Sequence, residues 1–283
     1  MARIDGCRTF SPLAAMLAIV LGGITDRVVA AELGYPLAIA SSDEGPIYLA
    51  DRELPGVWKL EGERISLHFL ASKKLRTPLN AVRCVALDTQ GKLLAGDSAT
   101  RDVYRFDEQN RPVPLAKGGI GIPMSIAVTQ GGDLVVADLE LHVIWKIPAA
   151  GGAPEKMAAV PAPRGVAVDS EDRVWVVSHG KDQVVRLNAD GVSEPVVTGR
   201  PFQFPHQIVV DERGTAYVTD GYAQAIWKVV RGAEPQKWVS GAPLVNPVGI
   251  ARRGASLLVV DPRAKAVFQI DELGKLTRLP ANP

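Results

Sequence analysis

Three cationic or protonatable residues stand in the same place relative to three apolar runs of the chain. They are the second residues of Val82-Arg-Cys-Val-Ala-Leu, Pro163-Arg-Gly-Val-Ala-Val and Pro205-His-Gln-Ile-Val-Val. A guanidinium group binds a carboxylate or phosphate through two parallel hydrogen bonds, and an imidazole gains or loses a proton near neutral pH. If the fold brings the three runs together, Arg83, Arg164 and His206 form a site for an anion.

Three polar residues follow two other apolar runs. His179 comes after Val174-Trp-Val-Val-Ser, while Asp220 and Tyr222 come after Ala216-Tyr-Val-Thr. His179 and Tyr222 could serve as acid, base or hydrogen-bond donor. A buried arginine rarely lacks a partner, so two interpretations stay open. Either neighbouring carboxylates, Asp220 above all, neutralise the cations for structural reasons, or the cations line an anion-binding pocket.

A repeat along the chain predicts how these residues are positioned. Six times an anchor residue, Asp in five cases, is followed seven residues later by an aromatic residue or Val: Asp51 and Trp58, Asp97 and Tyr104, Asp138 and Trp145, Ser178 and Val185, Asp220 and Trp227, Asp261 and Phe268. The anchors are 46, 41, 40, 42 and 41 residues apart. A period of about 40–45 residues built from short strands is typical of β-propellers. We therefore expect an all-β fold, a six-bladed β-propeller with four antiparallel strands per blade.

The pattern inside each repeat supports this prediction. The first run is almost continuously apolar, as in a strand buried between neighbouring blades, and the second ends at the anchor. The third alternates, as in Trp145-Lys-Ile, and the fourth is polar or contains proline, which suits an exposed edge. Each blade is therefore one contiguous repeat. We expect the ring to close by packing of blade six against blade one, without strand exchange.

In such a ring two positions per blade face the funnel around the central channel. The first is the residue after the leading residue of the first strand: Leu37, Arg83, Met124, Arg164, His206 and Val248. The second is the loop after the anchor: Arg52-Glu53, Ser98, Leu139-Glu140, His179-Gly180, Gly221-Tyr222 and Pro262-Arg263. Features shared by most blades, such as the anchor carboxylates, are expected to hold loop amides in place. Features found in single blades, the arginines and histidines, are the candidates for function.

Several segments resemble NHL-repeat six-bladed propellers and the related SMP-30/gluconolactonase-like and strictosidine-synthase-like propellers. They are Tyr217-Val-Thr-Asp, Pro163-Arg-Gly-Val-Ala-Val-Asp and the stretch from Asp138 to Trp145-Lys-Ile, and the likeness extends over residues 36–279. The resemblance implies a funnel-face site for a ligand or protein partner, or hydrolysis of a small ester or lactone. The Asn-Arg pair common in the NHL loop between the second and third strands is missing.

The resemblance also implies metal sites that this sequence does not reproduce. An SMP-30-type lactonase holds a divalent metal with an Asp in Pro-Asp-Gly, where this chain has Arg164 in Pro-Arg-Gly. An amidating-lyase-like propeller binds zinc through Pro-His in three blades, and only Pro205-His206 matches. No nucleophile elbow for a Ser-His-Asp triad is visible. We therefore expect no metal and no cofactor, and leave open whether the protein is an enzyme.

The N-terminal residues 1–31 have the composition of a cleavable signal peptide. Basic residues precede a short apolar run, and Val29-Ala-Ala supplies small residues before Glu32. The run of 13 residues from Pro12 to Ile24 is too short to span a bilayer, which needs about 20. We expect a secreted or periplasmic protein consisting of one propeller over residues 32–283, with no membrane insertion after cleavage.

The charge and cysteine content limit the partners. The chain has 32 Lys and Arg and 31 Asp and Glu, and residues 32–283 contain 29 of each. This balance gives no basic face for nucleic acid. Cys84 is the single cysteine after residue 31 and replaces a glycine of other repeats, so we expect a small buried residue. The partner we expect is a small anionic molecule, or a protein or peptide, at the funnel face of a monomer.

Overall fold

The structure, a computed structural model, describes residues 32–74, 76–188 and 190–280. The signal-peptide prediction falls on residues 1–31 and so lies outside the described residues. The described residues form strands, turns and loops, and they contain no helix that is long and apolar enough to cross a membrane.

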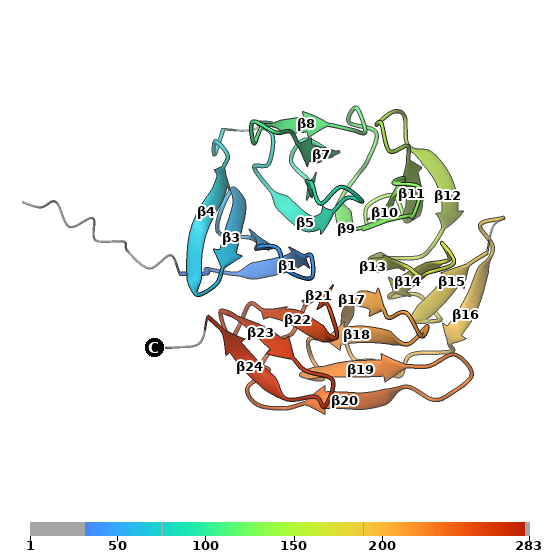
Figure 1. Ribbon diagram of the computed structural model, residues 1–283. Helices are drawn as coiled ribbons and strands as arrows, with labels where there is room; N and C mark the ends of the chain where they lie inside the picture. Colours follow the sequence, from blue (N-terminus) through green and yellow to red (C-terminus); the bar gives the residue numbers. More distant parts are fainter. Residues whose placement is uncertain (1–31, 75, 189, 281–283) are drawn as a thin grey trace, which may run out of the picture. The chain divides into compact units, whose positions relative to one another are not determined.

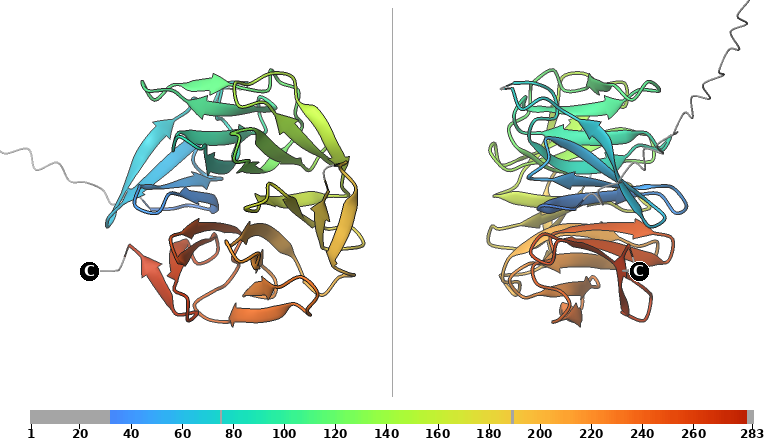
Figure 2. Two further views of the ribbon diagram at one scale, coloured as in Figure 1. Left: turned by 45° about the vertical axis from the view of Figure 1, so that its right-hand side comes forward. Right: turned by 90° about the vertical axis from the view of Figure 1, so that its left-hand side faces the viewer.

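The strands form six four-stranded sheets in chain order around a central axis (Figures 1 and 2). Blades 1 to 3 consist of β1 (Pro36–Ser41), β2 (Ile47–Asp51), β3 (Gly56–Glu61), β4 (Arg64–Leu70), β5 (Val82–Leu87), β6 (Leu93–Asp97), β7 (Asp102–Phe106), β8 (Pro112–Pro114), β9 (Pro123–Val128), β10 (Leu134–Asp138), β11 (Val143–Ile147) and β12 (Glu155–Ala159).

Blades 4 to 6 repeat the arrangement with β13 (Pro163–Val168), β14 (Val174–Ser178), β15 (Val184–Leu187), β16 (Ser193–Val197), β17 (Pro205–Val210), β18 (Ala216–Asp220), β19 (Ala225–Val229), β20 (Gln236–Ser240), β21 (Gly249–Arg253), β22 (Ser256–Asp261), β23 (Ala266–Ile270) and β24 (Leu276–Leu279). Each sheet pairs consecutive strands in antiparallel fashion, as β21 pairs with β22 and β22 with β23 in the last blade. The predicted six-bladed, all-β propeller is confirmed.

The ring closes between blade 6 and blade 1 without strand exchange, as predicted, because each sheet contains four consecutive strands. Gly249 of β21 lies so close to β1 that an added Cβ would be 2.9 Å from the Leu37 carbonyl oxygen. At the other end of the same strands, the amide of Gly254 donates to Asp43 Oδ1 at 2.8 Å. Packing and a few polar contacts therefore join the two ends of the described chain.

The anchor residues hold the loops that enter each blade, as expected. The Asp138 carboxylate accepts the amides of Gly121 and Ile122 at 2.7 and 3.0 Å, seventeen and sixteen residues upstream. Asp51, Asp97, Asp220 and Asp261 accept corresponding pairs of upstream amides. In blade 4 the shorter Ser178 instead donates to the Pro161 carbonyl oxygen at 2.6 Å.

In blades 3 and 5 the seven-residue spacing also places an indole N–H on the anchor carboxylate, whereas the buried Nε1 of Trp58 in blade 1 has no hydrogen-bond partner among the described residues. The indole Nε1 of Trp145 donates to Asp138 at 2.9 Å, and that of Trp227 donates to Asp220 at 3.2 Å. A buried indole N–H usually has such an acceptor. The Trp145 and Trp227 side chains thus fasten the third strand to the end of the second, in addition to packing between blades.

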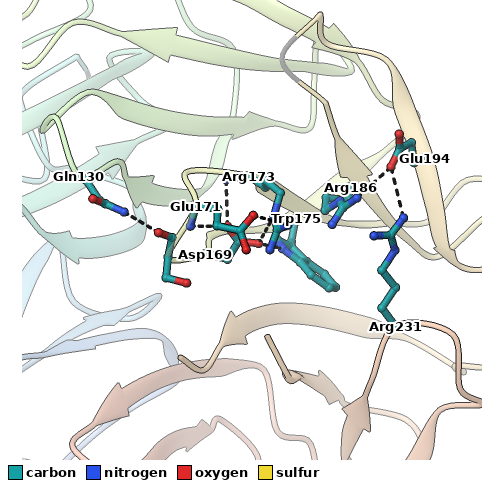
Figure 3. A network of polar contacts seen from close by, with 9 residues as sticks. Gln130, Asp169, Glu171, Arg173, Trp175, Arg186, Glu194 and Arg231 are labelled. Atoms are coloured by element: carbon teal, nitrogen blue, oxygen red, sulfur yellow. Dashed lines mark hydrogen bonds and ion pairs between the residues drawn. The ribbon is translucent and has the colours of Figure 1, made fainter. Parts of the chain in front are cut away.

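The other end of blade 4, where β13 turns into β14, has a polar network centred on a carboxylate (Figure 3). Asp169, which follows β13, accepts hydrogen bonds at 2.8 Å from both the indole of the fully buried Trp175 and Nε of Arg173. Arg186 pairs with Glu194 at 3.0 Å within the same blade. These contacts lie away from the funnel residues and have a structural role.

Candidate funnel-face site

In five of the six blades a β-bulge aims one side chain of the first strand at the channel. The register shifts between Pro36 and Ala38, between Val82 and Cys84 and at the start of β9, β13 and β17. The residues left unpaired are Leu37, Arg83, Met124, Arg164 and His206, with Gln207 beside His206. A bulge re-aims the side chain it leaves unpaired, and all of these residues line one cavity of about 260 Å³.

Blade 6 departs from this pattern. Its leading proline, Pro247, lies 14 residues before the anchor Asp261. In each of the other blades the leading residue of the first strand lies 15 residues before the anchor. The strand β21 begins at Gly249 and pairs with β22 without a register shift. The first strand of this blade therefore begins at Gly249 and not at the leading Pro247. The missing residue belongs to the β21–β22 turn, because Gly249 pairs with Val260 as Ala38 pairs with Ala50 in blade 1. Val248 still lines the cavity, together with Asn246.

The remaining lining residues come from loops. Arg52, Tyr222 and Arg263 belong to the predicted loops after the anchors, whereas Tyr35 and Phe204 immediately precede the leading prolines of blades 1 and 5. The sequence interpretation missed Tyr35, Phe204, Gln207 and Asn246. An aromatic residue directly before the leading proline, found in these two blades only, was the available signal for the first two.

Arg164 lies in this cavity without an anionic partner. Its Nε is buried and has no hydrogen-bond partner, and its Cζ lies 5.4 Å from the centre of the Phe204 ring. Burial lowers the pKa of the Arg164 guanidinium. Among the residues that the structure describes, no carboxylate oxygen lies within 4.0 Å of Arg164 or of Arg52, Arg83 or Arg263.

Asp220 does not neutralise these cations by direct pairing. Its carboxylate is fully buried and accepts the amides of Gln203 and Phe204, each at 2.8 Å, as well as the Trp227 indole. The oxygens are therefore occupied by the entry loop of blade 5. Asp220 does not line the cavity, and its negative charge reaches His206 only as a minor influence on the pKa of that residue.

Two further arginines of the cavity, Arg83 and Arg52, contact neutral groups. Nε of Arg83 donates to the hydroxyl of Ser98 at 3.0 Å, which orients the side chain without offsetting its charge. Cζ of Arg52 lies 5.8 Å from the centre of the Tyr35 ring. A guanidinium over an aromatic face gains about 0.5–2 kcal/mol. Neither of these contacts supplies a negative charge that would offset the positive charge of the guanidinium.

The two histidines differ in their relation to this charge. Burial above all, with smaller contributions from the neighbouring Arg164 and His179, lowers the pKa of His206 to about 4. Burial also lowers the pKa of His179, whose Nε2 lies 2.7 Å from the Pro205 carbonyl oxygen. Because a carbonyl oxygen only accepts, Nε2 of His179 carries the hydrogen. Both imidazoles are neutral at pH 7, and His206 is the one that lines the cavity.

Phe204 connects these groups. Its ring stacks on Tyr222 with centroids 4.7 Å apart and meets the rings of His179 and His206 edge-on at 4.6 and 4.9 Å. With Arg164 above it, Phe204 is the centre of one wall of the cavity. Tyr222 is 61% exposed, so this wall includes an aromatic surface open to solvent.

Gln207 forms the floor. Its Nε2 donates to the Met124 carbonyl oxygen at 3.2 Å, and its Oε1 accepts from the Ser125 hydroxyl at 3.0 Å. The side chain thus reaches from blade 5 past blade 4 to blade 3. It separates the funnel-face cavity from a second cavity of about 500 Å³, which is lined by the middle of the six first strands.

The structure brings four of the six predicted site residues together. Arg83, Arg164, His206 and Tyr222 line the cavity, His179 contacts it through Phe204, and Asp220 lies behind it. Cys84 is buried, as expected for a small core residue. No cluster of three His, Cys, Asp or Glu residues with metal-site geometry occurs in the described ranges.

Solved structures of other proteins share this fold. A virginiamycin B lyase from Staphylococcus aureus superimposes with a TM-score of 0.68 at 15% identity, covering 89% of this chain and 88% of that one. A gluconolactonase from Xanthomonas campestris gives 0.69 at 14% identity, covering 90% and 93%. The propeller in a nidogen/laminin complex gives 0.66 at 16% identity, covering 86% and 92%. No protein-family model and no curated protein sequence matches the chain.

The fold and the cavity together define a six-bladed β-propeller with a cation-lined funnel. Its structural neighbours are six-bladed propellers of the SMP-30/gluconolactonase-like and NHL types, which confirms the expected resemblance. At 14–16% identity the likeness concerns the fold, and function has to be argued from the residues of the cavity.

Proposed function

We propose that the protein binds a small anionic molecule in the funnel-face cavity. The observation that carries the proposal is Arg164, a guanidinium whose buried Nε lacks a partner and which no described carboxylate approaches within 4.0 Å. Removing charge from water is costly unless a partner compensates it. A bound carboxylate supplies that partner from outside the chain.

The surroundings of Arg164 favour a ligand over a structural role. A structural arginine would be paired with a fixed carboxylate, as Arg173 is with Asp169 at 2.8 Å in the same blade. Arg164 instead shares its cavity with three further arginines and with the neutral donors Asn246 and Tyr222. A volume of about 260 Å³ is just below the range of about 300–1,000 Å³ for drug-sized ligands, which limits the occupant to a smaller molecule.

Isothermal titration of the purified protein with small carboxylates tests the proposal. Binding should weaken as salt rises, because the charge pairs are partly screened. Arg164→Met should weaken it, whereas Arg213→Met, which removes the same charge from an exposed turn on another loop, should leave it unchanged. Equal binding by the two variants, or no carboxylate binding at any salt concentration, would contradict the proposal.

Hydrolysis of a small ester or lactone is the second candidate function. His206 favours it, because a neutral imidazole that lines the cavity together with Arg164 is a candidate general base. A gluconolactonase is among the structural neighbours. The test is turnover of a lactone panel by the protein and by His206→Gln, with lactone-dependent acid release lost in the variant.

We also propose that the protein works outside the cytoplasm, on the basis of the residue pattern in 1–31. A small anion from the surrounding medium is then the partner we favour over a protein or peptide. Capture of a specific peptide with a salt-independent affinity would favour the protein partner instead.

A further inference from the structure

Two arginines of the cavity are presented in the same manner from opposite sides of the ring. Arg52 rests over Tyr35 of blade 1, and Arg164, the bulge residue of β13 in blade 4, rests over Phe204. Blades 1 and 4 are diametrically opposite in a ring of six, and Figure 1 shows β1 and β13 facing each other across the centre. The cavity therefore has a cationic wall at each end of one diameter.

With each guanidinium group over an aromatic ring, the N–H donors of both groups remain free. An aromatic ring attracts the positive charge without taking up the N–H donors in an ion pair, whereas a carboxylate binds at the edge of the guanidinium through two parallel N–H bonds. Neither Arg52 nor Arg164 donates a side-chain hydrogen bond to a described residue, and the buried Nε of Arg164 has no partner. Each ring thus steadies one guanidinium while its edge stays available for a carboxylate.

Most of the remaining lining residues of the cavity come from the other blades. Arg83 and Arg263 come from blades 2 and 6, on either side of blade 1, and add to its cationic wall. Met124 of blade 3 and Val248 of blade 6 add apolar surface to the lining, beside the polar Gln207 and Asn246. The cavity therefore offers positive charge from two opposite blades and both apolar and neutral polar side chains elsewhere in its lining.

We propose that the ligand of this cavity is a small dicarboxylate that bridges Arg52 and Arg164 across the channel. One carboxylate binds at the wall formed by Arg52, Arg83 and Arg263, and the other binds Arg164 beside His206 and Tyr222. The short apolar spacer between them lies against Met124 and Val248. This inference rests on the proposed anion-binding function and specifies the class of anion.

Matched ligands test the bridge with the unmodified protein. Titration calorimetry compares linear dicarboxylates of increasing length with their monomethyl esters, which have nearly the same size and one charge fewer. We expect one chain length to bind best, and to bind about 10- to 100-fold more tightly than its half-ester, the range typical of a charge-assisted hydrogen bond. Equal affinity of diacid and half-ester at every length overturns the bridge but leaves anion binding intact.

Variants locate the two ends. Arg52→Met and Arg164→Met should each reduce the affinity for the diacid to that of its half-ester, while Arg213→Met should preserve the preference. If Arg164→Met loses the preference for the diacid over the half-ester but Arg52→Met keeps it, the bridge is overturned, because a residue other than Arg52 then holds the second carboxylate. A phosphate monoester that binds as tightly as the best diacid also overturns it, since both charges of that ligand sit at one end. If no carboxylate binds the unmodified protein, the proposed function fails together with this inference.

Discussion

The Ser125 hydroxyl of blade 3 donates to Gln207 Oε1 of blade 5 at 3.0 Å, although a complete blade lies between them. The contact is possible because Gly165, the residue of blade 4 at this level, has no side chain. A Cβ there would lie 2.8 Å from the Gln207 Cα and 3.0 Å from its Oε1. The floor of the funnel-face cavity thus depends on one glycine and one glutamine.

Gln207→Leu should lower the free energy of unfolding by about 1–3 kcal/mol, because the Ser125 hydroxyl and the Met124 carbonyl oxygen lose their shared partner in the channel. Urea unfolding measures the change. Gln236→Leu, at an exposed position on the edge strand β20, is the matched control and should change stability little. Equal stability of the two variants would show that the cross-channel contact contributes nothing.

Gly165→Ala should destabilise the protein by about 1–3 kcal/mol, because the added methyl group meets backbone atoms of His206 and Gln207 at 2.8 Å. The control is Gly131→Ala, where the nearest atom lies 3.9 Å away and the backbone is outside the left-handed region. Thermal unfolding of both variants checks the difference. A Gly165→Ala protein as stable as the control would mean that blades 4 and 5 separate without cost.

Arg164→Met should leave the protein as stable as the unmodified chain or more so. The substitution removes a cation whose transfer from water opposes folding, and it leaves no described carboxylate without a partner. Chemical denaturation of the variant measures this. A loss of about 3–5 kcal/mol would instead reveal that Arg164 neutralises a buried carboxylate and is structural.

The pH dependence of stability should report His206. Burial lowers its pKa to about 4, below the ordinary value of 6.5, so the unfolded chain binds a proton at a higher pH than the folded chain. Stability from this residue is therefore complete above pH 6.5 and falls as the pH drops toward 4, by on the order of 3 kcal/mol. Arg164, His179 and Asp220 are the charged or titratable groups that influence it.

Melting temperatures between pH 7 and pH 4.5 measure this effect, and His206→Gln should flatten the profile. Asp138 and Asp169 contribute in a lower range. Burial raises the pKa of each carboxyl, but the hydrogen bonds it accepts outweigh burial and hold the pKa below the ordinary value of 3.8. Their stabilisation is lost only as the pH falls below about 4. An unchanged slope in His206→Gln would assign the acid sensitivity to other groups.

Export is tested by expressing the full chain in a bacterium. We expect the mature protein to begin at or near Glu32 and to appear outside the cytoplasm, because small residues precede that position. N-terminal sequencing of the purified protein shows the cleavage point. An intact Met1 on a cytoplasmic protein would reject the signal-peptide hypothesis.

The amino-acid sequence by itself determined the fold and the funnel positions. The spacing of Asp138 and Trp145 and its equivalents predicts the blade, since each repeat must place an anchor at the end of its second strand. The residue after each leading residue of a first strand reaches the cavity in five blades because a local β-bulge aims it there. A bulge depends on nearby residues, so it recurs with the repeat.

The tertiary structure alone decided which charges are compensated. The repeat places Asp220 and Arg164 at the same funnel, which suggests an ion pair. In the structure, the Asp220 oxygens instead accept hydrogen bonds from amides of the entry loop and from Trp227. Whether an Asp220 oxygen binds an amide or an arginine depends on distances between several blades, which residue spacing along the chain does not predict. For the same reason, the placing of Arg164 over Phe204 and of Arg52 over Tyr35 emerges only when the ring is assembled.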